Sequence, residues 1–380
     1  MKPLHLLIKP ASSLCNLRCG YCFYHDVSSY RAVPSYGLMS EDTQELLVQR
    51  VFAEADGPVT LAFQGGEPTM AGLPFYQRLI ELVNHYNVNK WPVQYALQTN
   101  AQVIDESWAA FLARHHFLVG VSLDGDKAIH DAQRLTPDGR GSFQTVMNAL
   151  RQLEAHQVET NILTVVHASV ARHIERVYRF FSRNQLGYLQ FIPCLTPFGV
   201  DPAAVPYALT AKRYGQFLNR LFDLWYEDFM AGHYVSIRHF DNWVRMMAGE
   251  WPELCGMTGR CTCQLVVEAD GSVYPCDFYV TDEWKLGDIS TSTLTELAES
   301  ETSHRFVEAS LQLPDTCREC QWLPLCRGGC RRDRAETAGP AGPAGLNQFC
   351  EAYQMFFPYA ASRLEQLALI YRRQKGAGHV

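Results

Sequence analysis

Short apolar runs alternate with stretches of helical periodicity through the first half of the chain. Strands that alternate with helices predict parallel pairing with right-handed crossovers. Six such units indicate a partial (β/α)6 barrel, and an open doubly wound sheet is the alternative. The predicted strands are His5–Lys9, Val59–Phe63, Val93–Leu97, Phe117–Leu123, Asn161–Val166 and Tyr188–Ile192. The predicted helices are Ser40–Ala55, Pro74–Tyr86, Asp105–His115, Ser142–His156 and Val170–Asn184.

Polar clusters follow several of these apolar runs directly. They are Gln64–Glu67, Gln98–Asn100, Ser122–Gly125 and Pro193–Leu195. In barrel enzymes the chemistry lies at the carboxyl ends of the strands. We therefore expect these clusters to meet at one face of the barrel.

The second half of the chain has a different character. A long amphipathic helix is predicted over Ala211–Ala231, and a hairpin turns at Asp270-Gly271, a dipeptide that suits tight turns. Residues 254–350 are rich in cysteine and poor in long apolar periodicity, which is typical of a metal-stapled module. Ala335–Gly345 is expected to be a mobile loop. The expected domains are a barrel over 1–235, a cysteine-rich domain over 236–350, and a C-terminal helix and tail over 351–380.

Composition adds limits on location and partners. The 380 residues are 47% hydrophobic and carry a formal net charge of −7, which gives no general attraction to nucleic acid or to anionic membranes. The first residues lack the features of a signal peptide, and no stretch approaches the roughly 20 apolar residues of a membrane span. We expect a cytoplasmic protein.

Thirteen cysteines are many for a protein of that compartment. The odd count and a reducing environment argue against a disulfide framework, so metal binding is favoured. They form one early group, two later groups and one isolated residue. These are Cys15, Cys19 and Cys22; Cys255, Cys261, Cys263 and Cys276; Cys317, Cys320, Cys326, Cys330 and Cys350; and Cys194.

The early group points to radical chemistry. Three thiolates on the short loop of Cys15, Cys19 and Cys22 can bind three irons of a cubane cluster and leave the fourth iron open. The open iron can chelate the amino and carboxylate groups of S-adenosylmethionine and pass an electron to its sulfonium. Structural zinc is the alternative, with His25 as a fourth ligand, although the spacing is unusual for zinc.

The motifs resemble those of a known superfamily. The cysteine triad with an aromatic residue before its third member, Tyr21, and Gly65-Gly66-Glu67-Pro68 after an apolar strand resemble the radical S-adenosylmethionine superfamily. The later cysteines resemble its twin-cluster SPASM extension. From end to end the chain is similar to anaerobic sulfatase-maturating enzymes, for example in Leu7–Pro10 and Tyr274–Tyr279. That family oxidises a cysteine or serine of a nascent sulfatase to formylglycine.

The resemblance implies cofactors and their ligands. It implies three [4Fe–4S] clusters and S-adenosylmethionine. The triad would hold the radical-generating cluster. One auxiliary cluster would have Cys255, Cys261, Cys276 and Cys330 as ligands, and the other Cys317, Cys320, Cys326 and Cys350. S-adenosylmethionine would contact Tyr21, Gly66, Ser122, Arg134 and Leu195. Cys194 and Cys263 remain, and we expect both to be small buried apolar residues.

The resemblance also implies a catalytic base. Asp277 would take the proton that the substrate thiol or hydroxyl loses, and a free aspartate, with a pKa of about 3.9, is already ionised at neutral pH. Tyr24 and Gln64 are predicted substrate contacts at the same face. Glu67 is expected to shape its loop rather than to do chemistry.

Two further interpretations remain open. One is a SPASM maturase that crosslinks or modifies a different ribosomally made peptide, and the other is a metal-bearing scaffold without catalysis. The scaffold does not explain why polar clusters follow the strands. For the sulfatase-maturating interpretation the expected partners are an unfolded or nascent sulfatase polypeptide and a reduced flavodoxin- or ferredoxin-type electron donor. The protein is expected to act as a monomer.

Overall fold

The computed structural model describes residues 3–201, 204–334 and 345–377. The chain folds into two compact units, and each is assembled from segments that are far apart in sequence. The first unit comprises Met1–Leu123, His130–Asn161 and Thr262–Phe306. The second comprises Asp124–Ile129, Ile162–Cys261 and Val307–Val380.

A mainly parallel sheet forms the centre of the first unit. The strands β1 (Leu4–Ile8), β2 (Val59–Phe63), β3 (Val93–Thr99) and β4 (Phe117–Ser122) pair in parallel in chain order. A later hairpin, β8 (Val266–Val267) and β9 (Ser272–Tyr274), extends this sheet because β8 pairs in parallel with β1. The order within the unit is β10-β9-β8-β1-β2-β3-β4, where β10 is Gly287–Asp288.

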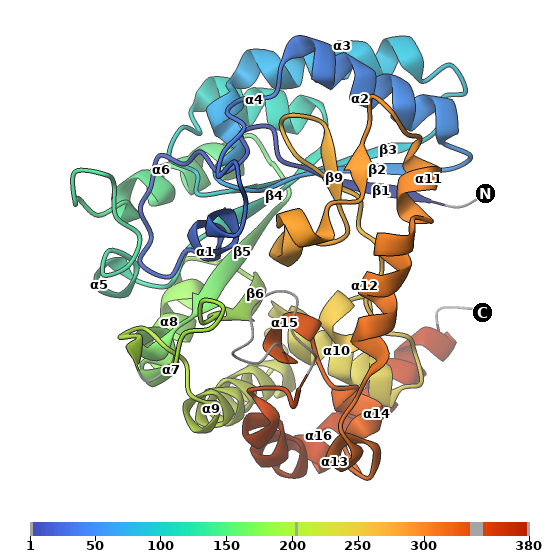
Figure 1. Ribbon diagram of the computed structural model, residues 1–380. Helices are drawn as coiled ribbons and strands as arrows, with labels where there is room; N and C mark the ends of the chain where they lie inside the picture. Colours follow the sequence, from blue (N-terminus) through green and yellow to red (C-terminus); the bar gives the residue numbers. More distant parts are fainter. Residues whose placement is uncertain (1–2, 202–203, 335–344, 378–380) are drawn as a thin grey trace. The chain divides into compact units, whose positions relative to one another are not determined.

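Helices between the strands cover the sheet. Figure 1 shows α2 (Glu41–Glu54), α3 (Leu73–Tyr86) and α4 (Glu106–Arg114) along one face of it. The starts of α2 and α4 follow from capping, because the Ser40 side chain accepts a hydrogen bond from the Thr43 N–H and Asp105 accepts one from the Trp108 N–H. The remaining helices before residue 160 are α1 (Phe23–Ser29), α5 (Lys127–His130) and α6 (Phe143–Ala155).

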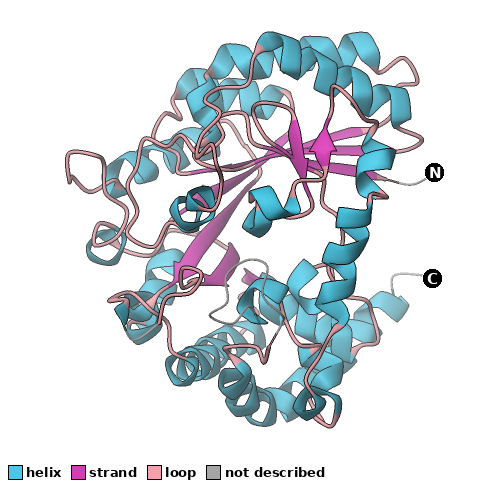
Figure 2. Cartoon of the chain, in the orientation of Figure 1, coloured by secondary structure: helices cyan, strands magenta, loops and turns pink. Residues whose placement is uncertain are grey.

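The second unit is predominantly helical around three parallel strands (Figure 2). The strands are β5 (Thr160–Val166), whose first two residues belong to the first unit, β6 (Tyr188–Pro193) and β7 (Ser236–Ile237). The helices are α7 (Ala168–Arg172), α8 (Ile174–Arg183), α9 (Ala211–Met230), α10 (Arg238–Met247), α13 (Asp315–Arg318), α14 (Leu323–Cys326), α15 (Arg331–Arg334) and α16 (Cys350–Ala377). The helices α11 (Leu294–Ala298) and α12 (Glu301–Leu311) lie between α10 and α13 in the chain.

The core of the second unit is an aromatic cluster between α9, α10 and α16. The Phe356 ring lies 5.6 Å from Phe222 and 4.8 Å from Trp243, measured between ring centroids. All three side chains are almost completely buried. Aromatic pairs at such distances contribute energy beyond the apolar area that they bury.

The periodicity predicted most of these elements. Each of the six predicted strands is present within two residues of its expected bounds, and the hairpin at Asp270-Gly271 is confirmed. The single helix expected over Val170–Asn184 is wrong, because His173 leaves helical geometry and divides the segment into α7 and α8. The sequence did not predict that β8 joins the main sheet. The loop expected at Ala335–Gly345 lies outside the described residues, apart from Gly345.

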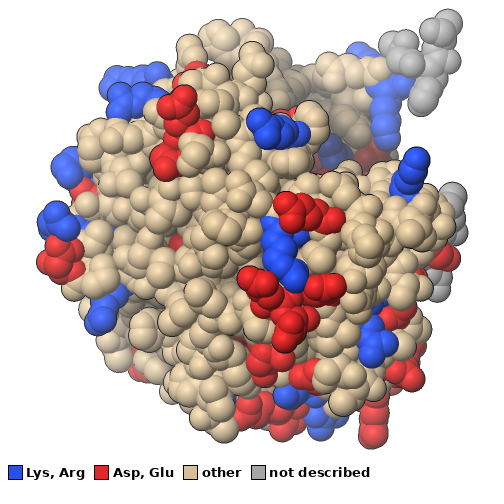
Figure 3. All heavy atoms as spheres, turned by 90° about the horizontal axis from the view of Figure 1, so that it is seen from above, with Lys and Arg blue, Asp and Glu red and all other residues tan. Residues whose placement is uncertain are grey.

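The surface has mixed charge. On the face shown in Figure 3, acidic and basic side chains occur in small groups separated by wide uncharged areas. Among the described helices, none combines the length and the apolar character that crossing a membrane requires.

Truncating the aromatic cluster tests this core. Phe356→Ala should lower the free energy of unfolding by about 3 to 5 kcal/mol, because it removes transfer energy and leaves a cavity. Leu369→Ala, on the same helix but 52% exposed, should cost far less. Urea denaturation of both variants measures the difference, and equal losses would contradict this account of the core.

Candidate active site

The carboxyl ends of β2 and β3 are joined by one buried carboxylate. Glu67 is 1% exposed, and its Oε1 accepts hydrogen bonds from the hydroxyls of Thr69, at 2.6 Å, and Thr99, at 2.7 Å. Its Oε2 accepts one from the Asn100 N–H at 2.7 Å. Burial raises the pKa of Glu67, and these hydrogen bonds oppose the rise. Glu67 therefore fixes two loops together, in agreement with the shaping role that the sequence suggested.

The cysteine triad lies directly against the glycines of the same motif. Gly66 has a φ of +54°, and a Cβ atom there would lie 2.3 Å from the Leu14 carbonyl oxygen. The Glu67 N–H donates to that same oxygen at 2.7 Å. Asn100 Nδ2 in turn lies 3.7 Å from the Cys15 sulfur. The triad loop, which follows β1, therefore meets the polar clusters after β2 and β3 at one edge of the sheet.

The three thiols of the triad share an environment suited to ligation. Burial raises the pKa of Cys15 to about 12, the Leu17 N–H opposes this, and Cys19 and Cys22 add to it. Burial also raises the pKa of Cys22, whose sulfur accepts hydrogen bonds from backbone N–H groups at the start of α1. Close thiols with backbone donors are the donor set that iron–sulfur clusters use.

The residues predicted to contact S-adenosylmethionine lie in both units. In the first unit the buried Arg134 guanidinium lies 5.5 Å from the centroid of the Tyr21 ring, so this arginine is not solvated. Ser122 ends β4, and its hydroxyl accepts a hydrogen bond from Gln98 at 3.2 Å. Leu195 follows β6 in the second unit and is half-buried there.

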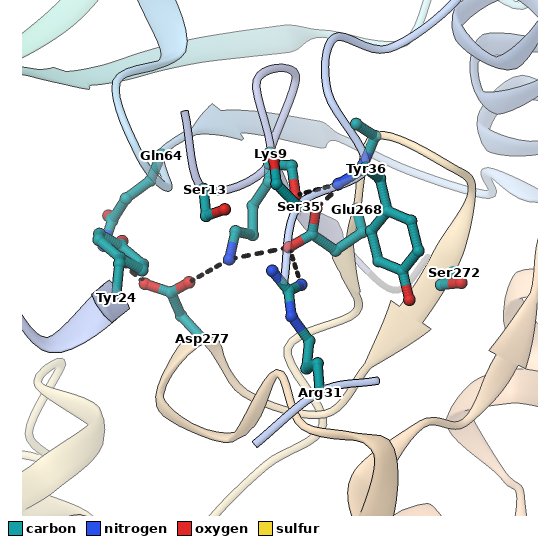
Figure 4. Close-up of polar contacts among 12 residues, drawn as sticks. Lys9, Ser13, Tyr24, Arg31, Ser35, Tyr36, Gln64, Glu268, Ser272 and Asp277 are labelled. Carbon is teal, nitrogen blue, oxygen red and sulfur yellow. Dashed lines mark hydrogen bonds and ion pairs between the residues drawn. The ribbon is translucent and has the colours of Figure 1, made fainter. Parts of the chain in front are cut away.

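The predicted base and its two neighbours form one hydrogen-bonded group. Asp277 is 4% exposed, and its Oδ2 accepts hydrogen bonds from the Tyr24 hydroxyl at 2.6 Å and from Gln64 Nε2 at 3.0 Å. Gln64 also donates to the Tyr24 hydroxyl at 3.0 Å. Figure 4 shows Tyr24 and Gln64 pointing toward the carboxylate. Three residues that are far apart in the sequence thus meet around one acid.

Three charged residues behind Asp277 were missed by the sequence analysis. Lys9 Nζ lies 3.1 Å from Glu268 Oε1 and 3.9 Å from Asp277 Oδ1 (Figure 4). Arg31 also reaches Glu268 Oε1, at 2.6 Å. Lys9 directly follows a strand, within Leu7–Pro10, and this position at the end of a strand could have indicated a site residue. The sequence around Glu268 and around Arg31 contains no pattern that would indicate a site residue.

These charges change the protonation behaviour of both acids. Burial raises the pKa of Asp277 above its usual range, although Lys9 and the Tyr24 hydrogen bond oppose it, so the value of a free aspartate does not apply. Burial acts on Glu268 in the same direction, but Lys9 and Arg31 together outweigh it and hold the pKa of Glu268 below its usual range.

The later cysteines are divided between the two units. In the second unit burial raises the pKa of Cys326 to about 11, and Cys350, Cys317 and Cys320 add to the rise, so these four thiols share one environment. Burial likewise raises the pKa of Cys330, and the thiols of Cys261 and Cys255 contribute.

The other three cysteines have different surroundings. Cys276 belongs to the first unit, directly before Asp277. Cys194 is 3% exposed, as expected, whereas Cys263 is only half-buried, which corrects the expectation of a buried residue.

Comparisons with known proteins identify the family. Residues 10–181 match the radical SAM superfamily, and residues 255–321 match the SPASM iron–sulfur cluster-binding domain. The chain is 47% identical to the cysteine-type anaerobic sulfatase-maturating enzyme of Clostridium novyi, over 98% of this chain and 100% of that protein. The chain belongs to the anaerobic sulfatase-maturating enzymes.

Other relatives agree with this assignment. The cysteine-type enzyme of Clostridium perfringens strain 13 is 48% identical over 97% of this chain and 99% of its own. The serine-type anaerobic sulfatase-maturating enzyme of Bacteroides thetaiotaomicron is 31% identical over 96% and 91%. The solved structure of native anSMEcpe with bound AdoMet and Cp18Cys peptide superposes with a TM-score of 0.93, at 46% identity over 97% of this chain and 100% of that chain.

Family membership settles the fold class and the cofactors. The radical SAM match establishes the partial barrel rather than an open doubly wound sheet. An anaerobic sulfatase-maturating enzyme is a radical SAM enzyme, and its two matched domains imply [4Fe–4S] clusters and S-adenosylmethionine. The chemistry of the donors suits these groups, since a triad of thiols would leave one iron of a cubane open and a set of four would close one. Within each set the thiols are near enough to affect one another's pKa.

The close approach at Gly66 gives a direct test of this site. Gly66→Ala should displace the triad loop, so that purified protein loses about four irons, the content of one cluster. Gly139→Ala is the matched control, because Gly139 also has a positive φ, of +79°, but nothing lies within 4 Å of a Cβ there. The control should lose only about 1 to 2 kcal/mol of stability from backbone strain. Equal iron contents in both variants would contradict the proposed packing.

Proposed function

We propose that this chain oxidises a cysteine of an unfolded or nascent sulfatase to formylglycine, using S-adenosylmethionine as the radical source. The observation that carries the proposal is the buried Asp277 carboxylate, which Tyr24 and Gln64 hold next to Cys276, a residue that we propose as a cluster ligand. A base next to an electron acceptor is what this oxidation needs, because the substrate must lose a proton and an electron after its hydrogen atom.

The reaction divides between the cofactors and the side chains. When bound, S-adenosylmethionine and the triad cluster supply a radical that removes a hydrogen atom from the substrate Cβ, and the auxiliary clusters accept one electron. Asp277 takes the thiol proton. Loss of the hydrogen atom, the proton and the electron turns the C–S single bond into the C=S double bond of a thioaldehyde. Water then hydrolyses the thioaldehyde to the aldehyde, and the sulfur leaves as hydrogen sulfide.

The side chains around Asp277 and the triad prepare these steps. Tyr24 and Gln64 fix the direction of the carboxylate through its Oδ2 atom. Arg134 can pair with the carboxylate of the methionine group in a bidentate fork. Tyr21, Gly66, Ser122 and Leu195 would line the rest of the cofactor site. Cys255, Cys261, Cys276 and Cys330 would hold one auxiliary cluster, and the other cysteine set would hold the second.

Cysteine is favoured over serine as the target residue. The cysteine-type relatives are 47% to 48% identical to this chain, whereas the serine-type relatives are 29% to 31% identical. A reduced flavodoxin- or ferredoxin-type protein would supply the electron that starts each turnover, and the enzyme would act as a monomer.

An anaerobic assay tests this function. Reconstituted protein is incubated with S-adenosylmethionine, a reductant and a peptide that carries Cys-x-Pro-x-Arg or its serine version. Mass spectrometry should show an aldehyde in place of the side chain on the cysteine peptide, with slower conversion of the serine peptide. A different modification, such as a crosslink, would instead support another SPASM peptide maturase.

Asp277→Asn separates radical formation from product formation. The amide cannot take the proton, so formylglycine formation should fall by about 10²-fold or more, while 5′-deoxyadenosine still forms. Asp282→Asn, which changes an exposed carboxylate in the same segment, should leave both products unchanged. Chromatography of the adenosine product and mass spectrometry of the peptide measure the two. Normal formylglycine yield from Asp277→Asn would remove this residue from the mechanism.

Cys15→Ala acts at the earlier step. Loss of one of three ligands should prevent cluster assembly on the triad, so cleavage of S-adenosylmethionine should fall to background. Cys263→Ala is the control, because this cysteine is not among the proposed ligands and its variant should keep both iron content and cleavage. Retained cleavage in Cys15→Ala would contradict the assignment of the triad.

A further inference from the structure

We propose that Glu268 is a positioning residue that holds the Lys9 ammonium away from Asp277, so that one oxygen of the Asp277 carboxylate stays without a hydrogen-bond partner and can accept the substrate proton. This inference rests on the proposed function, in which Asp277 takes the substrate proton. It assigns a role to Lys9, Glu268 and Arg31, none of which the proposed reaction uses.

The two oxygens of Asp277 have different surroundings. Oδ2 accepts two hydrogen bonds, from Tyr24 and Gln64. Oδ1 is buried and accepts none from the described residues. Buried carboxylate oxygens ordinarily have hydrogen-bond partners because leaving one without a partner is costly. Oδ1 is therefore the oxygen whose hydrogen-bonding capacity is unused, and it can accept the proton of a substrate thiol bound beside it.

Lys9 is close enough to Oδ1 to occupy it but does not. Its Nζ lies 3.9 Å from Oδ1, whereas a charge-assisted hydrogen bond is about 2.7 to 2.9 Å long. The same Nζ lies 3.1 Å from Glu268 Oε1. The ammonium thus has two carboxylates within reach and is closer to Glu268.

Glu268 is itself firmly held. Its side chain is fully buried, and its Oε1 also receives the Arg31 guanidinium at 2.6 Å. Its Oε2 accepts a hydrogen bond from the Ala269 N–H at 3.2 Å. A carboxylate fixed by a second cation and a backbone donor cannot follow the lysine toward Asp277, so it acts as an anchor.

The path of the Lys9 side chain supports this geometry. A Cβ atom at Gly65, whose φ is +100°, would lie 2.4 Å from Lys9 Cε, so the lysine stem occupies the space that a larger residue would need. Its ammonium lies 5.0 Å from the centroid of the Tyr24 ring, a cation–π distance. The stem is therefore confined, and the ammonium can pair with either of two neighbouring carboxylates, Glu268 or Asp277.

Removing the charge of Glu268 should make the Lys9 ammonium pair with Asp277 instead. With a neutral side chain at this position, Asp277 becomes the nearest carboxylate for the Lys9 ammonium. A direct ion pair between Lys9 and Oδ1 would then occupy the oxygen that the substrate thiol needs.

The test is Glu268→Gln in the reconstituted holoenzyme with the cysteine peptide. We expect the formylglycine made per 5′-deoxyadenosine to fall at least about tenfold, since the open oxygen of the base is lost while radical formation continues. A purely structural defect would lower both products together and leave their ratio unchanged. Glu283→Gln is the matched control, because it removes a 46%-exposed carboxylate from an ion pair with Arg305 and should leave the ratio at its original value.

A second substitution distinguishes positioning from general damage. Lys9→Met combined with Glu268→Gln removes the cation that would close on Asp277, so the ratio should recover to above that of Glu268→Gln alone. If either variant fails to fold, as judged by iron content, Lys9→Met alone and Glu268→Asp replace them. Lys9→Met should keep a higher ratio than Glu268→Asp, whose shorter carboxylate holds the ammonium less closely.

Different results would overturn the role of Glu268 and the proposed function. An unchanged ratio in Glu268→Gln, or no recovery when Lys9 is also replaced, would overturn the role of Glu268 while leaving the proposed function in place. Absence of formylglycine from the unsubstituted enzyme would instead overturn the proposed function.

Discussion

The first unit depends on how four buried charges are arranged at the carboxyl end of its sheet. Lys9 and Arg31 face Glu268 and Asp277, two positive groups against two negative ones, with side chains at most 6% exposed. Removing charges from water is costly, and such a group is tolerated only when its members neutralise one another with good geometry. The balance here fixes the ends of β1 and β8, the segment after α1 and the residues after Cys276 in one arrangement.

A second constraint acts alongside this one. The neutral donors around Glu67 and the close approach of Gly66 to Leu14 bring the triad loop against the loops that follow β2 and β3. Together the two constraints place the triad loop and the Asp277 group at the same edge of one sheet. The chemistry of an anaerobic sulfatase-maturating enzyme requires that proximity, because the hydrogen atom and the proton leave the same small side chain.

Sequence patterns predicted much of this fold and part of the site. The six strands and most helices followed from apolar periodicity, because burial on one face is a local property of the chain. Tyr24 and Gln64 were expected at the same face as Asp277, and the structure places them in hydrogen-bonding contact with it. The partners Glu268 and Arg31 were not predicted, because each pairs with residues more than two hundred positions away and carries no local mark of it.

The sequence by itself determined the cysteine spacing, the alternation of strands and helices, and the glycines that allow close backbone approach. These depend on residue type and short-range order. Only the tertiary structure decided that a hairpin from the cysteine-rich segment extends the main sheet beside β1. It also decided that one oxygen of Asp277 accepts hydrogen bonds while the other has no partner among the described residues. The physical reason is that strand pairing and the neutralisation of buried charge are set by contacts between distant segments, which no local pattern encodes.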